Sequence, residues 1–198
     1  EYDRKGQLKV LRDPYNQSPA YTYNKHGLVA SITDPMGRTT RYHWNEKTGE
    51  LESIVDPMGH TRRFSYDEWG QLIASEFVPK GQNSGGSTVW DYGPTGMVEN
   101  VTSPSGESTT YKYNDNDQLI KYIDHQGRTT EFVYDGLSQV VERIDAEGNR
   151  LRYEYDTERN LTALINEKGE SHQFIYDANE RLIKEIGFDG RVQNYKYN

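Results

Sequence analysis

The chain has 198 residues, a formal net charge of −8 and 16 tyrosines, and it contains no cysteine. Without cysteine it cannot form a disulfide framework or a thiolate metal site, and its acidic balance without a basic stripe argues against nucleic-acid binding. No apolar run approaches the roughly 18 residues that a spanning helix needs, so we expect no membrane span in this segment.

An aromatic residue recurs at a nearly fixed spacing along the whole chain. Successive members are separated by 21, 21, 22 and 26 residues and then five times by 21 residues. Such a period is typical of a small supersecondary unit repeated end to end, in which each copy packs on its neighbours. We interpret residues 1–198 as a single array of about nine repeats, a fragment of a larger protein because both ends lie inside a repeat. These signature aromatics are Tyr2, Tyr23, Trp44, Tyr66, Tyr92, Tyr113, Tyr134, Tyr155, Tyr176 and Tyr197.

Two kinds of turn alternate along the chain, and the first kind follows each signature aromatic. It covers residues 3–6, 24–27, 67–70 and 93–96, and residues 45–49 form a version that is one residue longer. Its last residue is Gly in these early copies, which predicts a type I turn followed by a left-handed, bulged residue. In the later copies we expect either backbone strain or a different loop shape, because the Gly is replaced by Asp117, Ser138, Arg159 and Glu180.

The second kind of turn combines a capping Asp, Asn or Ser with a Gly three residues later. Residues 34–37 and 56–59 both read Asp-Pro-Met-Gly, and further members cover residues 103–106, 124–127, 145–148 and 166–169. The pattern suits a type I turn, because Asp caps the first position, Pro presets φ at the second and Gly occupies the fourth. We interpret these as structural turn residues: Asp34, Pro35, Gly37, Asp56, Pro57 and Gly59.

Two strands of about six residues fit between the turns of each copy. This predicts an all-β fold of tandem hairpins with a 21-residue period, joined in one continuous, curved antiparallel sheet. In residues 153–174, Tyr153 and Tyr155 lie on one face of the first strand, and residues 161–165 form the second strand. By strict alternation Leu119 and Ile123 share one face, with the polar Lys121 between them. Neither face is apolar enough to form a water-free core, so we expect a thin, single-layered sheet.

The signature aromatics are expected to stack into columns that hold adjacent hairpins together. One copy is lengthened by an insertion near residues 77–88, whose Gly, Ser, Asn and Pro content predicts a surface loop. We interpret the following signature aromatics as structural repeat residues: Tyr23, Trp44, Tyr66, Tyr92, Tyr113, Tyr134, Tyr155 and Tyr176.

No residue pattern in the chain indicates a catalytic, metal or cofactor site. The residue after each signature aromatic is Asp, Asn or Gly in different copies, which suits a turn cap but not a general acid or a metal ligand. No serine stands in a Gly-x-Ser-x-Gly motif, and the histidines lack metal-ligand spacing. We therefore expect a protein that is not an enzyme and has no cofactor. The histidines are His26, His43, His60, His125 and His172.

Residues 64–72, Phe-Ser-Tyr-Asp-Glu-Trp-Gly-Gln-Leu, and the two Asp-Pro-Met-Gly turns carry a family resemblance. At this period they resemble the YD repeats of Rhs proteins, which are close to repeats in teneurins and in the C component of insecticidal Tc toxins. The resemblance covers the whole chain. It implies a strip of β-hairpins that spirals into a hollow β-shell around a C-terminal toxin domain.

The resemblance also implies a function, partners and a location. The chain would be a structural wall segment that encapsulates and protects a polymorphic toxin, and a type VI secretion system would deliver it to competitor cells. Its partners would be the rest of the shell and the enclosed toxin, together with secretion spike or chaperone proteins. The alternative is an extracellular adhesion or carbohydrate-binding YD-repeat module at the cell surface.

Overall fold

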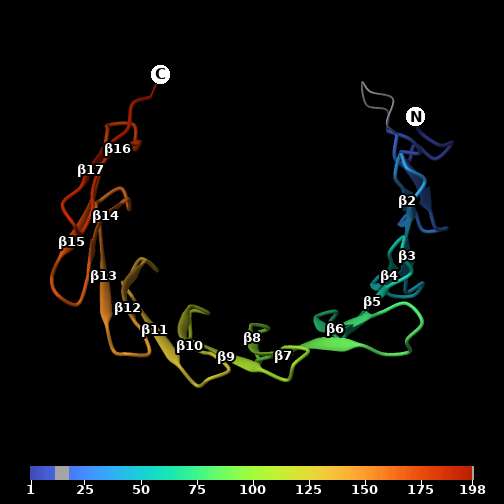
Figure 1. The fold of residues 1–198 in the computed structure, drawn as a ribbon, viewed down its shortest axis with the longest axis horizontal. Coiled ribbons are helices and arrows are strands. Elements are labelled where there is room, and N and C mark those ends of the chain that lie inside the picture. The colour runs from blue at the N-terminus through green and yellow to red at the C-terminus, as the bar shows by residue number, and fades with distance from the viewer. Residues whose placement is uncertain (12–17, 198) are drawn as a thin grey trace. The chain divides into compact units, whose positions relative to one another are not determined.

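The computed structural model describes residues 1–11 and 18–197, and every strand pairing in these ranges is antiparallel. The all-β prediction is confirmed, with strands joined as successive hairpins (Figure 1). The strands are β1 (Ala20–Tyr23), β2 (Val29–Thr33), β3 (Thr39–Trp44), β4 (Leu51–Val55), β5 (Thr61–Tyr66), β6 (Leu72–Val78), β7 (Gly86–Tyr92), β8 (Val98–Thr102), β9 (Ser108–Tyr113), β10 (Leu119–Ile123), β11 (Thr129–Tyr134), β12 (Val140–Ile144), β13 (Arg150–Tyr155), β14 (Leu161–Ile165), β15 (Ser171–Tyr176), β16 (Leu182–Ile186) and β17 (Val192–Asn194).

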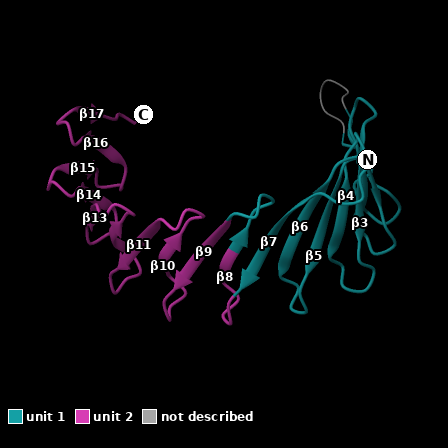
Figure 2. Cartoon of the chain, turned by 60° about the horizontal axis from the view of Figure 1, so that its bottom comes forward, with its two compact units in different colours: residues 1–92, 101–107 teal, residues 93–100, 108–198 magenta. Residues whose placement is uncertain are grey.

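The chain divides into two compact units (Figure 2). Unit 1 contains residues 1–92 and 101–107, and unit 2 contains residues 93–100 and 108–198. Strands β1 to β7 pair in chain order within unit 1, and β9 to β17 pair in chain order within unit 2. Both units are therefore built from the same hairpin, repeated.

Both kinds of turn have one geometry. In the turn after a signature aromatic, Asp67 N donates to Gln71 O (3.0 Å) and Gly70 N donates to Asp67 O (3.2 Å). The Asp-Pro-Met-Gly turn repeats this pattern, since Asp34 N donates to Arg38 O (2.9 Å) and Gly37 N donates to Asp34 O (2.9 Å). Gly37 and Gly70 each have φ 80°. This is a type I turn closed by a left-handed bulge residue, so the bulged form predicted for the first kind also describes the second.

The later copies keep this turn although they lack the glycine. Asp117, Ser138, Arg159 and Glu180 have φ of 57°, 67°, 73° and 61°, in the left-handed region. Of the two expected outcomes, backbone strain is the one observed, because the left-handed conformation costs a residue with a Cβ about 1–2 kcal/mol. The turn at residues 45–49 is one residue longer, as predicted: Asn45 N donates to Glu50 O at 2.8 Å.

A β-bulge beside most signature aromatics changes which side chains share a face. Tyr113 lies opposite Leu119, but the next pair is Lys112 with Lys121, so Ile120 is an extra residue. Cross-strand partners point to the same face, and one extra residue shifts the alternation by one. Leu119 therefore lies on the face of Tyr113, whereas Ile123 lies on the opposite face. The prediction that Leu119 and Ile123 share a face is wrong, because strict alternation does not allow for the bulge.

The bulge sorts the side chains of each unit into two faces. The aromatic face carries the signature aromatics and their companions two residues earlier, as in Phe132 and Tyr134. The mixed face alternates charged and aliphatic side chains, as in Lys121 and Glu131. Among the described residues, only Val78, Ala163 and Ser75 are buried. The expected thin sheet is observed, and within the described ranges there is no helix that could cross a membrane.

The strain at the later turns can be tested by exchanging glycine and serine. Ser138→Gly should raise the free energy of unfolding by about 0.5–1 kcal/mol, because glycine adopts a left-handed φ without a Cβ clash. Gly148→Ser is the matched reverse change: its φ is 86° and an added Cβ meets nothing within 4 Å, so it should cost about 1 kcal/mol. Urea unfolding measures both, and a loss of stability in Ser138→Gly would contradict the assignment.

Candidate functional site: the junction between repeats

The side chain of each signature aromatic reaches back to the backbone of the preceding repeat. The Tyr155 hydroxyl donates to the Val140 carbonyl at 2.8 Å, a residue 15 positions earlier. Trp44 makes the same bond with its indole Nε1, which donates to Val29 O at 2.7 Å. The bond recurs from Tyr23 to Tyr197 throughout the described residues. The other donors are Tyr23, Tyr66, Tyr92, Tyr113, Tyr134, Tyr176 and Tyr197, at 2.7–3.1 Å.

The acceptor carbonyl belongs to the residue at the bulge. Tyr134 donates to Leu119 O at 2.9 Å, and Leu119 is the residue opposite the previous signature aromatic, Tyr113. Between successive hairpins the ladder contains only three pairs, from Lys121–Glu131 to Ile123–Thr129, so it stops short of Leu119. A backbone carbonyl beyond the end of a ladder needs another donor. The phenol of the next repeat supplies it, and each bond therefore links two hairpins.

This role explains which aromatic residues occur at the two aromatic positions. Every signature aromatic is Tyr or Trp, both of which carry a hydrogen-bond donor. The companion position two residues earlier also accepts Phe, as Phe64, Phe132 and Phe174. Sequence reasoning missed the hydroxyl-to-carbonyl bond, although the absence of Phe from ten signature positions was a signal that could have revealed it.

The expected columns of stacked signature rings are not found among the described residues. The ring contacts in these ranges join His60 with Phe77, Tyr111 with Tyr122, and His172 with Phe174 and Phe188. None joins two signature aromatics. The physical reason is the wide spacing between copies. One strand lies between successive signature rings, so the rings are two strand spacings or about 10 Å apart, and each ring reaches the intervening backbone rather than the next ring.

Where a turn begins with Asp or Asn, that residue caps the turn with one side-chain oxygen. Asp34 Oδ1 accepts from Met36 N and from Arg38 N, each at 2.9 Å, and Asp56 Oδ1 accepts from Met58 N and His60 N in the same way. Asn24 and Asn166 use their Oδ1 identically. Pro35 and Pro57 follow the caps, and Gly37 and Gly59 hold the left-handed positions with φ 80° and 90°.

The other polar atom of the capping side chain forms a hydrogen bond with the side chain four positions later. Asp124 Oδ2 accepts from Arg128 Nε at 2.7 Å, whereas Asn166 Nδ2 donates to Glu170 Oε2 at 2.7 Å. A carboxylate cap thus faces a donor and an amide cap faces an acceptor. This local complementarity explains why Asp and Asn interchange at the caps.

The fold shifts the pKa values of the signature phenols and of the Asp turn caps. Burial raises the pKa of the Tyr155 phenol above its ordinary value of 10.0, and burial acts in the same way on Tyr66, Tyr113 and Tyr176. The side-chain hydrogen bond from Arg181 is the largest cause that holds the pKa of Asp177 below its ordinary value of 3.8. Neutral phenols and ionised caps are therefore the forms that the fold stabilises.

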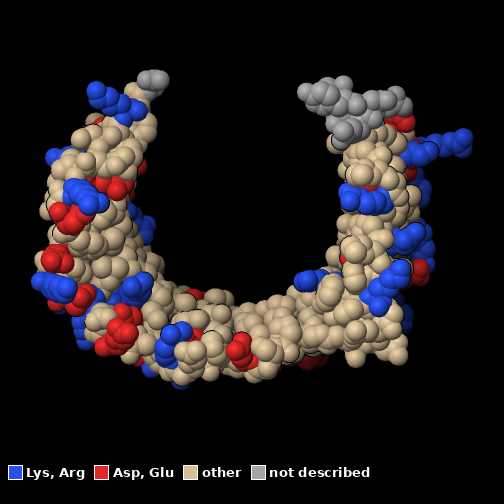
Figure 3. Space-filling model, viewed as in Figure 1, with Lys and Arg blue, Asp and Glu red and all other residues tan. Residues whose placement is uncertain are grey.

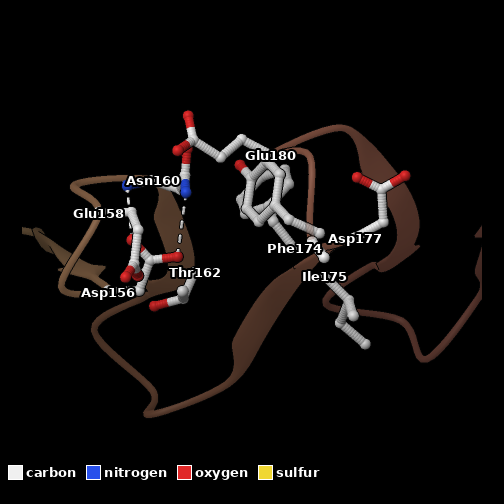
Figure 4. A pocket seen from close by; sticks show the side chains of 10 residues that line it. Asp156, Glu158, Asn160, Thr162, Phe174, Ile175, Asp177 and Glu180 are labelled. Atoms are coloured by element: carbon white, nitrogen blue, oxygen red, sulfur yellow. Dashed lines mark hydrogen bonds between the residues drawn. The ribbon is translucent and has the colours of Figure 1, made fainter.

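The Asp carboxylates that line a recess between two neighbouring turns are already engaged in hydrogen bonds. This recess of about 440 Å³ lies between the turns that begin at Asp156 and Asp177 (Figure 4). Asp156 already accepts from Asn160 N and Nδ2, and Asp177 accepts from Arg181. No group of three metal-ligating side chains occurs within residues 1–11 and 18–197. The space-filling view shows Lys and Arg interspersed with Asp and Glu over the strands of unit 2 (Figure 3).

Comparisons with known proteins agree with this architecture. A family model described as Teneurin YD-shell matches residues 1–146, and a model described as RHS Repeat matches residues 134–171. No curated protein matches the sequence. The chain is similar to solved structures of Tc toxin components, at identities that concern the fold alone.

Three of these solved structures are informative. The crystal structure of TcdB2-TccC3 without its hypervariable C-terminal region has a TM-score of 0.67 at 15% identity, covering 100% of this chain and 13% of that chain. The crystal structure of TcdB2-TccC3 has a TM-score of 0.67 at 14% identity, covering 100% and 14%. A mutant of the Photorhabdus luminescens Tc holotoxin pore has a TM-score of 0.61 at 14% identity, covering 92% and 12%. The chain thus spans a small fraction of the length of these relatives.

Removing one signature hydroxyl should weaken the array locally. Tyr155→Phe should lower the free energy of unfolding by about 1–2 kcal/mol, because the Val140 carbonyl loses its donor. Tyr153→Phe is the matched control on the same strand and face, where no hydroxyl bond is found among the described residues. Urea unfolding measures both, and equal costs for the two variants would contradict the assigned role.

The raised phenol pKa values predict a loss of stability at alkaline pH. The unfolded chain ionises near the ordinary tyrosine value of 10.0, while the folded phenols stay neutral to higher pH, so the unfolded state binds fewer protons in that range. The stabilisation should be complete below pH 10 and should fall as pH rises through the raised values. Urea midpoints from pH 8 to 11 measure this, and a flat profile would contradict it.

Proposed function

The chain belongs to the Teneurin YD-shell family, and from this premise we propose that it is a wall segment of an Rhs-type shell. The shell encapsulates a C-terminal toxin polypeptide and protects it until delivery to competitor cells. The observation that carries the proposal is the uninterrupted series of hairpins, each bonded to the one before it through a signature hydroxyl. Such a strip can extend without limit and can form a wall.

The thin sheet supports a containing role. Among the described residues only three are buried, as expected of a thin lining rather than of a binding domain with a packed core. The carboxylates of the sheet cap turns and its phenols bind carbonyls, so the recurring polar groups maintain the wall. An enzymatic role in this segment has no support from the arrangement of the described side chains.

The delivery route and the partners rest on the family. The remaining shell and the enclosed toxin are the proposed partners, with a secretion spike or a chaperone as further partners and a secreted location. The solved relatives are named as parts of a Tc holotoxin, so type VI secretion is supported only by the Rhs resemblance.

One observation favours the alternative of an extracellular adhesion or carbohydrate-binding module. The Trp69 side chain is 77% exposed at the tip of a turn, where an indole can stack on a sugar ring. This alternative predicts saturable glycan binding by the protein that Trp69→Ala abolishes.

Electron microscopy of the full-length protein tests the proposed function. We expect a hollow particle with density inside it, and resistance of the enclosed segment to added protease until the wall is unfolded. A solid, extended rod, or an internal segment that protease cuts as fast as an unfolded chain, would contradict the proposal.

A further inference from the structure

The insertion between β6 and β7 is attached to the preceding turn through a histidine. Residues 79–85, named the strap here, leave β6 directly after Val78, and the backbone N–H of Lys80 donates to His60 Nδ1 at 3.0 Å. The His60 ring lies against Phe77, with ring centroids 5.6 Å apart. The Lys80 side chain lies over Gly59, where an added Cβ would be 3.1 Å from Lys80 Cδ. The strap is therefore seated on the turn at residues 56–59.

The far end of the strap is attached by charged groups. Arg63 Nη1 donates to Asn83 O at 3.0 Å and to Glu76 Oε2 at 3.2 Å. Glu76 Oε1 accepts from Gly85 N at 2.9 Å. The hydrogen bonds of this attachment are made by Arg63 and Glu76 and not by His60.

We propose that His60 is a pH-sensitive latch that holds the strap when the imidazole is neutral and releases it when the imidazole is protonated. A ring nitrogen that accepts a hydrogen bond carries no proton, so the Lys80 bond requires neutral His60 with its proton on Nε2. The imidazolium has a proton on both nitrogens. Protonation therefore replaces the acceptor with a donor that faces the Lys80 N–H, and the bond is lost.

The charged groups around His60 do not compensate for this loss. Glu76 is already bonded to Arg63 and Gly85, and Asp56 Oδ1 already accepts from Met58 N and from His60 N. The remaining charged residues near the strap are positive, so none of them can accept a hydrogen bond from the imidazolium. The charged residues on the elements packed against the ring are Asp56, Arg62, Arg63, Glu76 and Lys80.

The latch occurs where the repeat symmetry is broken. The residue after the turn glycine is Arg38, Arg128 or Asn149 in other copies, and there it bonds to its own turn cap. Only His60 among the described copies lies beside an insertion that offers it a backbone donor. Release frees the strap at its Lys80 end. The latch operates in the same way whether or not the wall encloses a toxin.

Hydrogen exchange of the full-length protein, followed by mass spectrometry of peptides spanning residues 79–85, tests the latch. After correction for intrinsic exchange chemistry, the Lys80 amide should exchange at least about tenfold faster at pH 5.0 than at pH 7.5. In His60→Asn, which keeps an acceptor close to the Nδ1 position and takes up no proton, protection should be the same at both pH values. His60→Ala should be unprotected at both.

The control is His26→Asn, a histidine in another turn of unit 1, which should leave the pH response of the strap intact. Equal protection of the wild-type amide at both pH values would overturn the proposal. A pH response that persists in His60→Asn would also overturn it, because another group would then titrate. Circular dichroism of each variant shows whether it is folded. If His60→Ala does not fold, the comparison of wild type with His60→Asn still decides the test.

Discussion

The hydrogen bond from a signature aromatic to the carbonyl at the preceding bulge is the interaction on which the rest of the structure depends. A sheet one layer thick has almost no core, and only three described residues are buried. The backbone ladder between hairpins contains three pairs and then stops. Without the phenol of Tyr134 or Tyr155, the carbonyl beyond the ladder would lack a protein donor. The same side chain therefore satisfies the backbone and fixes the position of the next hairpin.

The sequence predicted the parts of the fold that depend on local chemistry. The repeat spacing predicted the hairpins. The Asp and Gly of the turns after the signature aromatics predicted the bulged type I geometry, because that signal arises within a few residues. The faces of the strands were predicted wrongly. The bulge opposite Tyr113 is set by the register of two paired strands, and strict alternation within one strand contains no information about it.

The aromatic positions show a second limit of sequence reasoning. Their regularity indicated a role in joining repeats, but not which atoms make the join. The contrast between Tyr155, which donates to a carbonyl, and Phe174, which occupies a companion position without a donor, distinguishes the two positions. Four left-handed residues with a Cβ, such as Arg159, show that the array keeps its turn shape even where the local residue disfavours it. The turn hydrogen bonds and the neighbouring hairpins together outweigh that strain.

The central claim is that the signature hydroxyls couple neighbouring repeats. The most direct test is the free energy of unfolding of a chain in which Tyr113, Tyr134, Tyr155 and Tyr176 are all replaced by Phe. If each bond contributes about 1–2 kcal/mol, the variant should lose about 4–8 kcal/mol. Its unfolding should become less cooperative because adjacent copies are no longer linked. A variant that unfolds at the wild-type urea midpoint with an unchanged slope would contradict the account.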